Sequence, residues 1–168
     1  MPLFLIGYMG SGKSTLGRRV AAALGWRFAD MDKEIERKAG MTVPEIFSTL
    51  GEPAFRQMEH DYILSLSPDD DVVVATGGGA PCHFDNMDAM NRLGVTLYLR
   101  VPAGALADRL VASRTRRPLI EGKSPESLRA YVDSHLSERE PYYTRATYTL
   151  EGVSINARHI VETLRLKL

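Results

Sequence analysis

The stretch Gly7–Thr15, which reads GYMGSGKST, holds the residues of this chain best suited to binding phosphate. It matches the pattern G-x-x-x-x-G-K-[ST], in which a glycine-rich turn points successive backbone N–H groups at an anion. Lys13 can reach the outer phosphates of a nucleotide, and the Ser14 hydroxyl can bind Mg²⁺. A chance glycine-rich turn is the alternative. The surroundings favour phosphate binding, because the strand-like run Leu3–Ile6 precedes the stretch and the helical pattern Leu16–Leu24 follows it.

Two aspartates, Asp30 and Asp32, follow a second strand-like run. An extended backbone there would aim both side chains in the same direction. Carboxylates at the C-terminal end of a parallel strand lie in the crevice where open α/β sheets hold ligands. One could hold a metal-bound water, and the other could accept the proton of an attacking hydroxyl. Helix capping is the alternative, and it could explain one of the two.

Arg56 and its two acidic neighbours offer a second kind of site. The helical pattern around them has an apolar stripe at spacings of three and four, formed by Phe55, Met58, Tyr62 and Leu66. Arg56 lies off this stripe, with Glu52 four residues before it and Glu59 three residues after it. The pattern is typical both of an exposed salt-bridge ladder and of an arginine that binds an anionic substrate. The local sequence leaves both interpretations open.

Three consecutive glycines, Gly77, Gly78 and Gly79, follow the apolar run Asp71–Ala75. Glycine is costly in backbone entropy, so three in a row indicate a backbone that approaches something closely, such as a ligand. A flexible turn is the alternative, although one glycine usually suffices for a turn.

The segment Ser113–Lys123 is basic, is interrupted by Pro118 and Gly122, and shows no clean period. Its three arginines between positions 114 and 117 repel one another unless an anion joins them. Between two predicted helices of a phosphate-binding protein, this segment is typical of a mobile flap. An exposed basic loop without a role is the alternative.

Arg139 precedes Pro141, where we expect a helix to break. It can therefore face an anionic ligand or complement the helix dipole, and the local sequence favours the dipole. The four histidines have no spacing that indicates a metal site or a catalytic dyad.

Short apolar runs alternate with helical patterns along the chain, which is typical of βαβ units and a parallel sheet. The predicted strands are Leu3–Gly7, Arg27–Asp30, Val72–Ala75, Thr96–Arg100 and Tyr148–Leu150. The predicted helices are Lys13–Leu24, Asp32–Ala39, Val43–Leu66 with a break near Gly51–Pro53, Asp85–Leu93, Ala103–Ser113, Pro125–Ser137 and Ala157–Lys167.

Length and composition predict a single domain, because 168 residues with 44% hydrophobic residues support one core. Lys and Arg balance Asp and Glu at 21 each, which gives no basic footprint for nucleic acid or an anionic membrane. No run is long and apolar enough for a membrane span. The single cysteine, Cys82, excludes an intrachain disulfide and suits a reducing compartment. We therefore expect a cytoplasmic protein that binds neither nucleic acid nor membranes.

Together, these motifs resemble the shikimate kinase family over nearly the full chain. The motifs occur in order as GYMGSGKST, DMD at 30–32, EPAFRQMEH with Arg56, ATGGGAP, RRPLI and SEREPYY. The phosphate-binding loop alone is shared by many NTPases, whereas the glycine triplet with the last two motifs is far more specific. Tyr8 stands where the family often has phenylalanine.

The resemblance implies an α/β fold of three α/β/α layers around a five-stranded parallel sheet with strand order 2-3-1-4-5. It implies one P-loop kinase domain, 1–168, with a substrate-binding helical region at 32–60 and a lid at 113–124. It also implies a monomer that phosphorylates the 3-hydroxyl of shikimate with ATP, giving shikimate 3-phosphate and ADP in aromatic amino-acid biosynthesis.

The resemblance assigns roles to residues by position. ATP would be bound by Gly10, Ser11, Gly12, Lys13, Ser14, Thr15, Arg114 and Arg117. One Mg²⁺ ion would be held by Ser14 and, through water, by Asp30. Shikimate would be bound by Asp32, Arg56, Glu59, Gly77, Gly78, Gly79 and Arg139. The catalytic residues would be Lys13, Asp32 and Arg117.

Two other functions compete with this one. Another small-molecule kinase of the same fold, such as a gluconate kinase, would have an acceptor without a carboxylate held by Arg56 and Arg139, or would hold that carboxylate differently. A GTP-binding switch would carry an N-K-x-D-like motif and a D-x-x-G motif after a strand, and the chain has neither.

Overall fold

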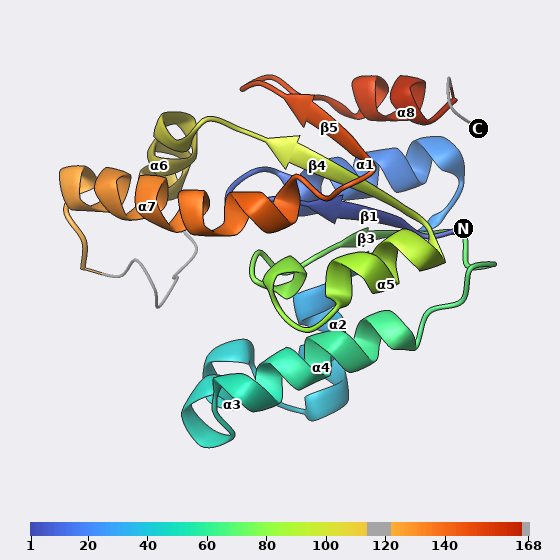
Figure 1. The fold of residues 1–168 in the computed structure, drawn as a ribbon, viewed down its shortest axis with the longest axis horizontal. Coiled ribbons are helices and arrows are strands. Elements are labelled where there is room, and N and C mark those ends of the chain that lie inside the picture. Colours follow the sequence, from blue (N-terminus) through green and yellow to red (C-terminus); the bar gives the residue numbers. More distant parts are fainter. Residues whose placement is uncertain (114–121, 166–168) are drawn as a thin grey trace.

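The computed structural model describes residues 1–113 and 122–165, which include a five-stranded sheet in the order β2-β3-β1-β4-β5 (Figure 1). Every neighbouring pair of strands runs parallel. The strands are β1 (Leu3–Ile6), β2 (Arg27–Asp30), β3 (Val72–Ala75), β4 (Val95–Arg100) and β5 (Tyr148–Glu151). The predicted fold class and strand order are therefore confirmed.

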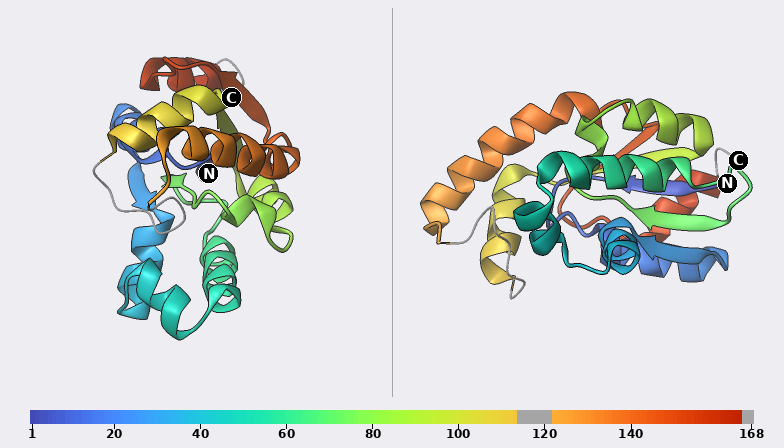
Figure 2. Two further views of the ribbon diagram at one scale, coloured as in Figure 1. Left: turned by 90° about the vertical axis from the view of Figure 1, so that its left-hand side faces the viewer. Right: turned by 90° about the horizontal axis from the view of Figure 1, so that it is seen from below.

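Helices cover both faces of the sheet and form the outer layers (Figures 1 and 2). They are α1 (Lys13–Leu24), α2 (Met31–Ala39), α3 (Val43–Thr49), α4 (Glu52–Leu64), α5 (Asn86–Leu93), α6 (Ala103–Ala112), α7 (Pro125–Tyr143) and α8 (Ala157–Arg165), with the short 3₁₀ helix η1 (Ala80–Cys82). Apart from α7, their bounds agree with the predicted ones to within two residues wherever the chain is described.

The core is divided by the sheet. Side chains alternate along a strand, so Leu3 and Leu5 of β1 pack with α1 and α8, whereas Phe4 and Ile6 pack with residues of α4, α5 and α7. All of β1 and β3 is buried, as expected for the central strands of a parallel sheet. The C-terminal ends of these two strands are thereby held rigidly, and each is followed directly by a glycine-rich turn.

The predicted break between α3 and α4 is confirmed, because α3 ends at Thr49 and Pro53 lies in the first turn of α4, where its missing N–H has no cost. The predicted end of α7 at Ser137 is wrong. The helix continues through Pro141 to Tyr143.

Contacts at the end of α7 explain how it continues past a proline, which costs about 3 kcal/mol within a helix. Tyr143 is fully buried, and its hydroxyl donates to the Gly78 carbonyl at 2.6 Å. Glu140 accepts a hydrogen bond from the Tyr98 hydroxyl and pairs with Arg100 at 2.7 Å. Tertiary packing thus outweighs the local preference of the sequence.

Two further predictions from the sequence concern the lid and membrane-spanning helices. Of the predicted lid at 113–124, residues 114–121 lie outside the described residues. Among the residues that are described, no helix has the length and apolar character that crossing a membrane requires.

Candidate active site

The phosphate-binding stretch Gly7–Thr15, here called the P-loop, runs into the start of α1. Gly10 has a φ of 80° and Gly12 a φ of 97°, conformations that residues with a Cβ rarely adopt. Gly12 is the N-cap of α1, so unpaired N–H groups and the positive end of the helix dipole face the loop. The Lys13 ammonium folds back over the loop and donates to the Gly7 carbonyl at 2.6 Å and the Tyr8 carbonyl at 2.9 Å.

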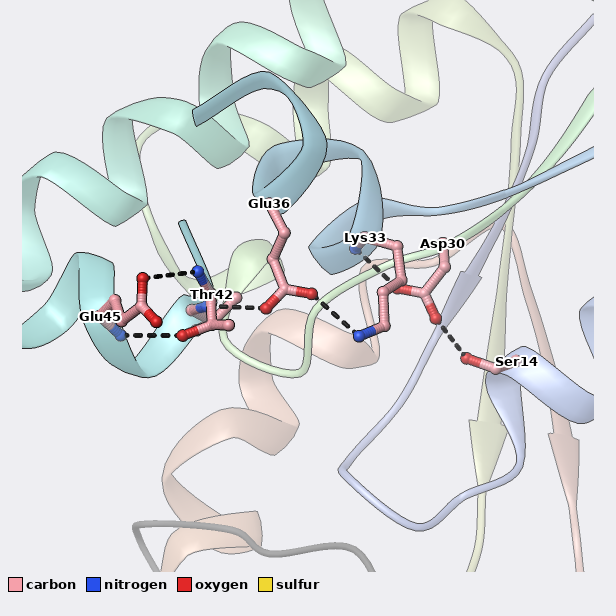
Figure 3. Close-up of polar contacts among 7 residues, drawn as sticks. Ser14, Asp30, Lys33, Glu36, Thr42 and Glu45 are labelled. Atoms are coloured by element: carbon pink, nitrogen blue, oxygen red, sulfur yellow. Dashed lines mark hydrogen bonds and ion pairs between the residues drawn. The ribbon is translucent and has the colours of Figure 1, made fainter. Parts of the chain in front are cut away.

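Asp30 joins the P-loop to α2 (Figure 3). Its Oδ2 accepts a hydrogen bond from the Ser14 hydroxyl at 2.9 Å, and its Oδ1 accepts one from the Lys33 backbone at 3.3 Å. It is the N-cap of α2, so the capping interpretation is confirmed for one of the two aspartates. The predicted extended backbone from Asp30 to Asp32 is wrong, because the helix begins at Met31.

A chain of polar contacts continues from Asp30 and fixes α2 against α3 (Figure 3). Glu36 accepts from the Lys33 ammonium at 2.9 Å and from the Val43 backbone at 2.8 Å. Thr42 and Glu45 form a reciprocal capping box at the start of α3. These contacts hold the first turn of α2, which carries Asp32, in place.

Asp32 lines a pocket of about 380 Å³ that is also lined by residues of the P-loop. The pocket is lined by Met9, Gly10, Gly12, Lys13, Ser14, Thr15, Asp30, Asp32, Ala75, Thr76, Gly77 and Gly78. Burial, and secondarily the negative charge of Asp30, raises the pKa of Asp32. Its Oδ1 is buried and accepts no hydrogen bond from any described residue. This oxygen can therefore accept a hydrogen bond or a proton from a ligand.

Glu59 and Arg56 form a buried ion pair on α4. The Glu59 side chain is 0% exposed and accepts from Arg56 Nη1 at 2.8 Å. Burial raises the pKa of Glu59 to about 7, against the opposing effect of Arg56. Arg56 is 12% exposed and lies against the ring of Phe55, 5.3 Å from its centroid. The exposed-ladder interpretation is therefore wrong for this pair, although Glu52 does contact Arg56 from an exposed position.

The predicted apolar stripe of α4 is correct only in part. Phe55 is buried, as is Leu66 just beyond the end of the helix, but Met58 and Tyr62 are half-buried. The buried positions of the helix also include Glu59 and Ile63. The helix is rotated so that Glu59 faces the site, and its charge is accommodated there by Arg56. Apolar periodicity cannot predict a buried carboxylate, because a carboxylate is buried where it has a charged partner and not where an apolar stripe continues.

The glycine triplet leaves room for the side chains of the site itself. A Cβ at Gly77 would lie 2.6 Å from Glu59 Oε2 and 3.1 Å from Asp32 Oδ1, and one at Gly79 would lie 2.5 Å from an Arg56 nitrogen. Glu59 Oε2, like Asp32 Oδ1, is buried and has no hydrogen-bond donor among the described residues. Two unsatisfied carboxylate oxygens thus flank one glycine at the edge of the pocket. A ligand with several hydroxyl groups can satisfy them.

Arg139 reaches the same turn from α7. A Cβ at Gly78 would lie 3.0 Å from its Nη1, and its guanidinium carbon lies 5.6 Å from the centre of the Tyr8 ring. Because Arg139 lies within the helix and faces the glycine turn, the helix-dipole interpretation is wrong. Arg56 and Arg139 therefore border adjacent glycines, although they are 83 positions apart in the sequence.

Two contacts of the site have no local sequence signal, although Tyr143 itself belongs to the SEREPYY motif. Arg109 of α6 donates to the Gly10 carbonyl at 3.1 Å and to the Val153 carbonyl at 2.7 Å, which joins the P-loop to the segment after β5. Tyr143 fixes the Gly78 carbonyl, as described above. Both contacts join distant parts of the chain, so no local pattern could have indicated them.

The donor set beside the P-loop suits a hard cation. The Ser14 hydroxyl and the Asp30 carboxylate supply oxygen ligands of the kind that Mg²⁺ prefers together with phosphates. Within residues 1–113 and 122–165, no group of three or more His, Cys, Asp or Glu side chains could hold a metal by itself. Arg114 and Arg117, predicted to bind ATP, lie outside the described residues.

Comparisons with known proteins agree on one family. The family model described as shikimate kinase matches residues 9–167. A shikimate kinase of Parabacteroides distasonis is 44% identical over 150 residues, which cover 89% of this chain and 87% of the relative.

Solved structures give the same result. The shikimate kinase of Bacteroides thetaiotaomicron superposes with a TM-score of 0.88 at 38% identity, over 99% of this chain and 96% of the other. That of Acinetobacter baumannii in complex with shikimate gives 0.84 at 36% identity, over 99% and 94%. A gluconokinase of Sinorhizobium meliloti, with a TM-score of 0.58 at 15% identity over 99% and 96%, shares the fold alone.

Proposed function

This chain belongs to the shikimate kinase family, and we propose that it transfers the γ-phosphoryl group of ATP to the 3-hydroxyl of shikimate. The products are shikimate 3-phosphate and ADP, in aromatic amino-acid biosynthesis. The observation that carries the proposal is the pair of unsatisfied oxygens on Asp32 and Glu59 beside Gly77, at the edge of the pocket that contains the P-loop. A hydroxylated acceptor satisfies these oxygens within reach of the bound phosphates.

The nucleotide's phosphates would lie on the P-loop. The backbone conformations of Gly10 and Gly12 and the N-terminus of α1 support this role. The binding residues would be Gly10, Ser11, Gly12, Lys13, Ser14 and Thr15. Arg114 and Arg117 would add positive charge on the nucleotide side, an assignment that rests on the family resemblance alone.

One Mg²⁺ ion would accompany ATP, with Ser14 as a direct ligand and Asp30 as a ligand through water. The 2.9 Å contact between the two side chains supports this assignment, because it places two hard oxygen donors side by side. When bound, the ion neutralises charge on the phosphates.

The carboxylate of shikimate would be held by Arg56 and Arg139. A guanidinium group can bind both oxygens of a carboxylate through its planar fork. Glu59 would hold Arg56 in orientation through their 2.8 Å hydrogen bond, and the backbone of Gly77, Gly78 and Gly79 would line the hydroxylated ring of shikimate.

The transfer itself needs positioned groups rather than a covalent intermediate. The 3-hydroxyl oxygen forms a bond to the γ-phosphorus, and the bond from that phosphorus to the bridging oxygen of ADP breaks. Asp32 accepts a hydrogen bond from the attacking hydroxyl, or its proton, and its raised pKa brings it nearer the working pH of a base. Lys13 and Arg117 would stabilise the charge on the transferred group.

We also propose that residues 1–168 act as one kinase domain, in which 32–60 form the substrate-binding region and 113–124 the lid. The protein would be a monomer in the cytoplasm. Light scattering after size-exclusion chromatography tests the monomeric state, with one 18.6 kDa chain as the expected mass. Cell fractionation tests the cytoplasmic location.

The function is tested by measuring ADP release from ATP and Mg²⁺ with shikimate, with gluconate and with no acceptor. We expect rapid release with shikimate only, and Asp32→Asn as the control should abolish it. Turnover of gluconate without turnover of shikimate would show that the acceptor is wrong. Equal ADP release in all three reactions would identify an ATPase instead.

A further inference from the structure

The P-loop residue Tyr8 is hydrogen-bonded to α7, a helix from a distant part of the sequence. Its side chain is 1% exposed, and its hydroxyl lies 2.9 Å from Nδ1 of His135 on α7. Its backbone carbonyl accepts from the Lys13 ammonium at 2.9 Å and from the Ser11 amide at 3.1 Å. Tyr8 therefore connects the phosphate-binding lysine to α7. A phenylalanine at this position would lack the hydroxyl.

His135 is held in place by aromatic neighbours. Its ring meets the Tyr8 ring edge-on, with centroids 5.4 Å apart, and lies 5.1 Å from the Tyr131 ring one turn earlier on α7. Lys123 covers the Tyr131 ring, with its ammonium 4.7 Å from the centroid. The imidazole is thus fixed in position on α7, where it can act as an anchor for the helix.

The charge state of His135 suits an acceptor. Burial, and secondarily the positive charge of Arg139, lowers its pKa, while Glu138 raises it and Arg56 lowers it further. The ring is therefore neutral at pH 7, and in the tautomer protonated on Nε2 its Nδ1 accepts a hydrogen bond from the Tyr8 hydroxyl.

Arg139 lies one helical turn after His135, on the same face of α7. Its guanidinium group also rests on the Tyr8 ring, 5.6 Å from the centroid, and faces Gly78. We propose that Tyr8 and His135 are positioning residues, whose hydrogen bond holds α7 against the P-loop so that Arg139 faces the acceptor. This inference rests on the proposed function, in which Arg139 binds the shikimate carboxylate.

The hydrogen bond could instead serve folding alone, and the two roles differ in what they change. A positioning role affects acceptor binding, because Arg139 touches the acceptor but not the nucleotide. A purely structural role lowers stability and leaves the Michaelis constants of the folded enzyme as they were. The substitution Tyr8→Phe separates them, because it removes the hydroxyl and keeps the ring under Arg139.

For Tyr8→Phe we expect the KM for shikimate to rise about fivefold, as for the loss of one hydrogen bond, with kcat and the KM for ATP within about twofold of wild type. The matched control is Tyr142→Phe, which removes a hydroxyl from a 39% exposed tyrosine on the same helix. It should change none of these values.

A second pair of variants tests whether the hydroxyl acts through His135. His135→Phe should raise the KM for shikimate as Tyr8→Phe does, and the double variant should be no worse than either single one. His135→Asn, whose amide oxygen can replace Nδ1 as acceptor, should remain near wild type. Thermal unfolding of every variant confirms that the kinetics describe folded protein.

The outcomes separate the inference from the proposed function. An unchanged shikimate KM in folded Tyr8→Phe, an equal rise in the KM for ATP, or additive effects in the double variant would overturn the positioning role alone. Wild-type protein that does not phosphorylate shikimate would overturn the proposed function, and the positioning role with it.

Discussion

The two halves of the candidate site are built in different ways. The nucleotide half comes from one contiguous segment, Gly7–Thr15, and works mainly through backbone geometry and a helix N-terminus. The acceptor half is assembled from side chains of α2, α4 and α7 around the glycine turn after β3. A contiguous loop suits a phosphate group common to many enzymes. An assembly of distant side chains can be changed residue by residue, so we propose that this half determines the acceptor.

The largest effect should come from Asp32, which lies where the nucleotide half and the acceptor half meet. Asp32→Asn is expected to lower kcat by about 10²–10⁴-fold, the range for loss of a positioned acid–base group, while the affinity for ATP stays within about twofold. Rapid-quench kinetics and calorimetric titration of ATP measure both. Lys13→Met is the contrast, because it should weaken ATP binding as well. Substantial turnover by Asp32→Asn would remove this residue from its central role.

The arginines test whether the acceptor half acts separately from the P-loop. Arg56→Ala and Arg139→Ala should each raise the KM for shikimate by about 10–150-fold, as expected for hydrogen bonds to a charged group. The affinity for ATP should be unchanged in both, as shown by calorimetry. If ATP affinity collapses and shikimate affinity is retained, the carboxylate site is wrongly placed.

A substitution at Gly79 tests whether the glycine turn leaves room for the side chains of the site. Gly79→Ala should raise the KM for shikimate by about tenfold, because its Cβ would lie 2.5 Å from Arg56 Nη1 and displace the guanidinium group. Gly40→Ala serves as the control, since a Cβ there meets nothing within 4 Å but a positive φ of 68° strains the backbone. It should lower the free energy of unfolding by about 1 kcal/mol and leave KM unchanged.

The last effect, which concerns stability rather than turnover, comes from the buried charge of Glu59. Burial raises its pKa from 4.5 to about 7, so the folded state binds the proton more tightly than the unfolded chain. Its contribution to stability therefore falls as pH rises between these values, by at most about 1.4 kcal/mol per pH unit. Urea unfolding of wild type and Glu59→Gln between pH 5 and 8 measures it. A difference that rises or stays flat with pH would contradict the burial of a charged carboxylate.

The difference between the halves also decides what could be predicted from the sequence. The P-loop, the strand order and the break between α3 and α4 follow from local patterns and a family resemblance. Contacts between distant segments could not be predicted in this way. Pro141 indicates a helix end, yet α7 continues because Tyr143 and Glu140 find partners in the glycine turn and in β4.

The acceptor half required the structure for the same reason. On its own helix Arg56 is equally consistent with an exposed ladder, and only the burial of Glu59 excludes that interpretation. The Arg109–Gly10 and Tyr8–His135 contacts join residues 99 and 127 positions apart, so they have no local signature. The glycine triplet correctly indicated a close approach. The approaching groups include the enzyme's own Arg56, Glu59 and Arg139.

The most direct test is a competition in one solution. The protein is incubated with ATP, Mg²⁺ and equal concentrations of shikimate and gluconate, and the products are identified by ³¹P and ¹H NMR. We expect shikimate 3-phosphate and ADP in equal amounts, with gluconate unchanged. Phosphorylated gluconate, or ADP with inorganic phosphate and unmodified shikimate, would contradict it.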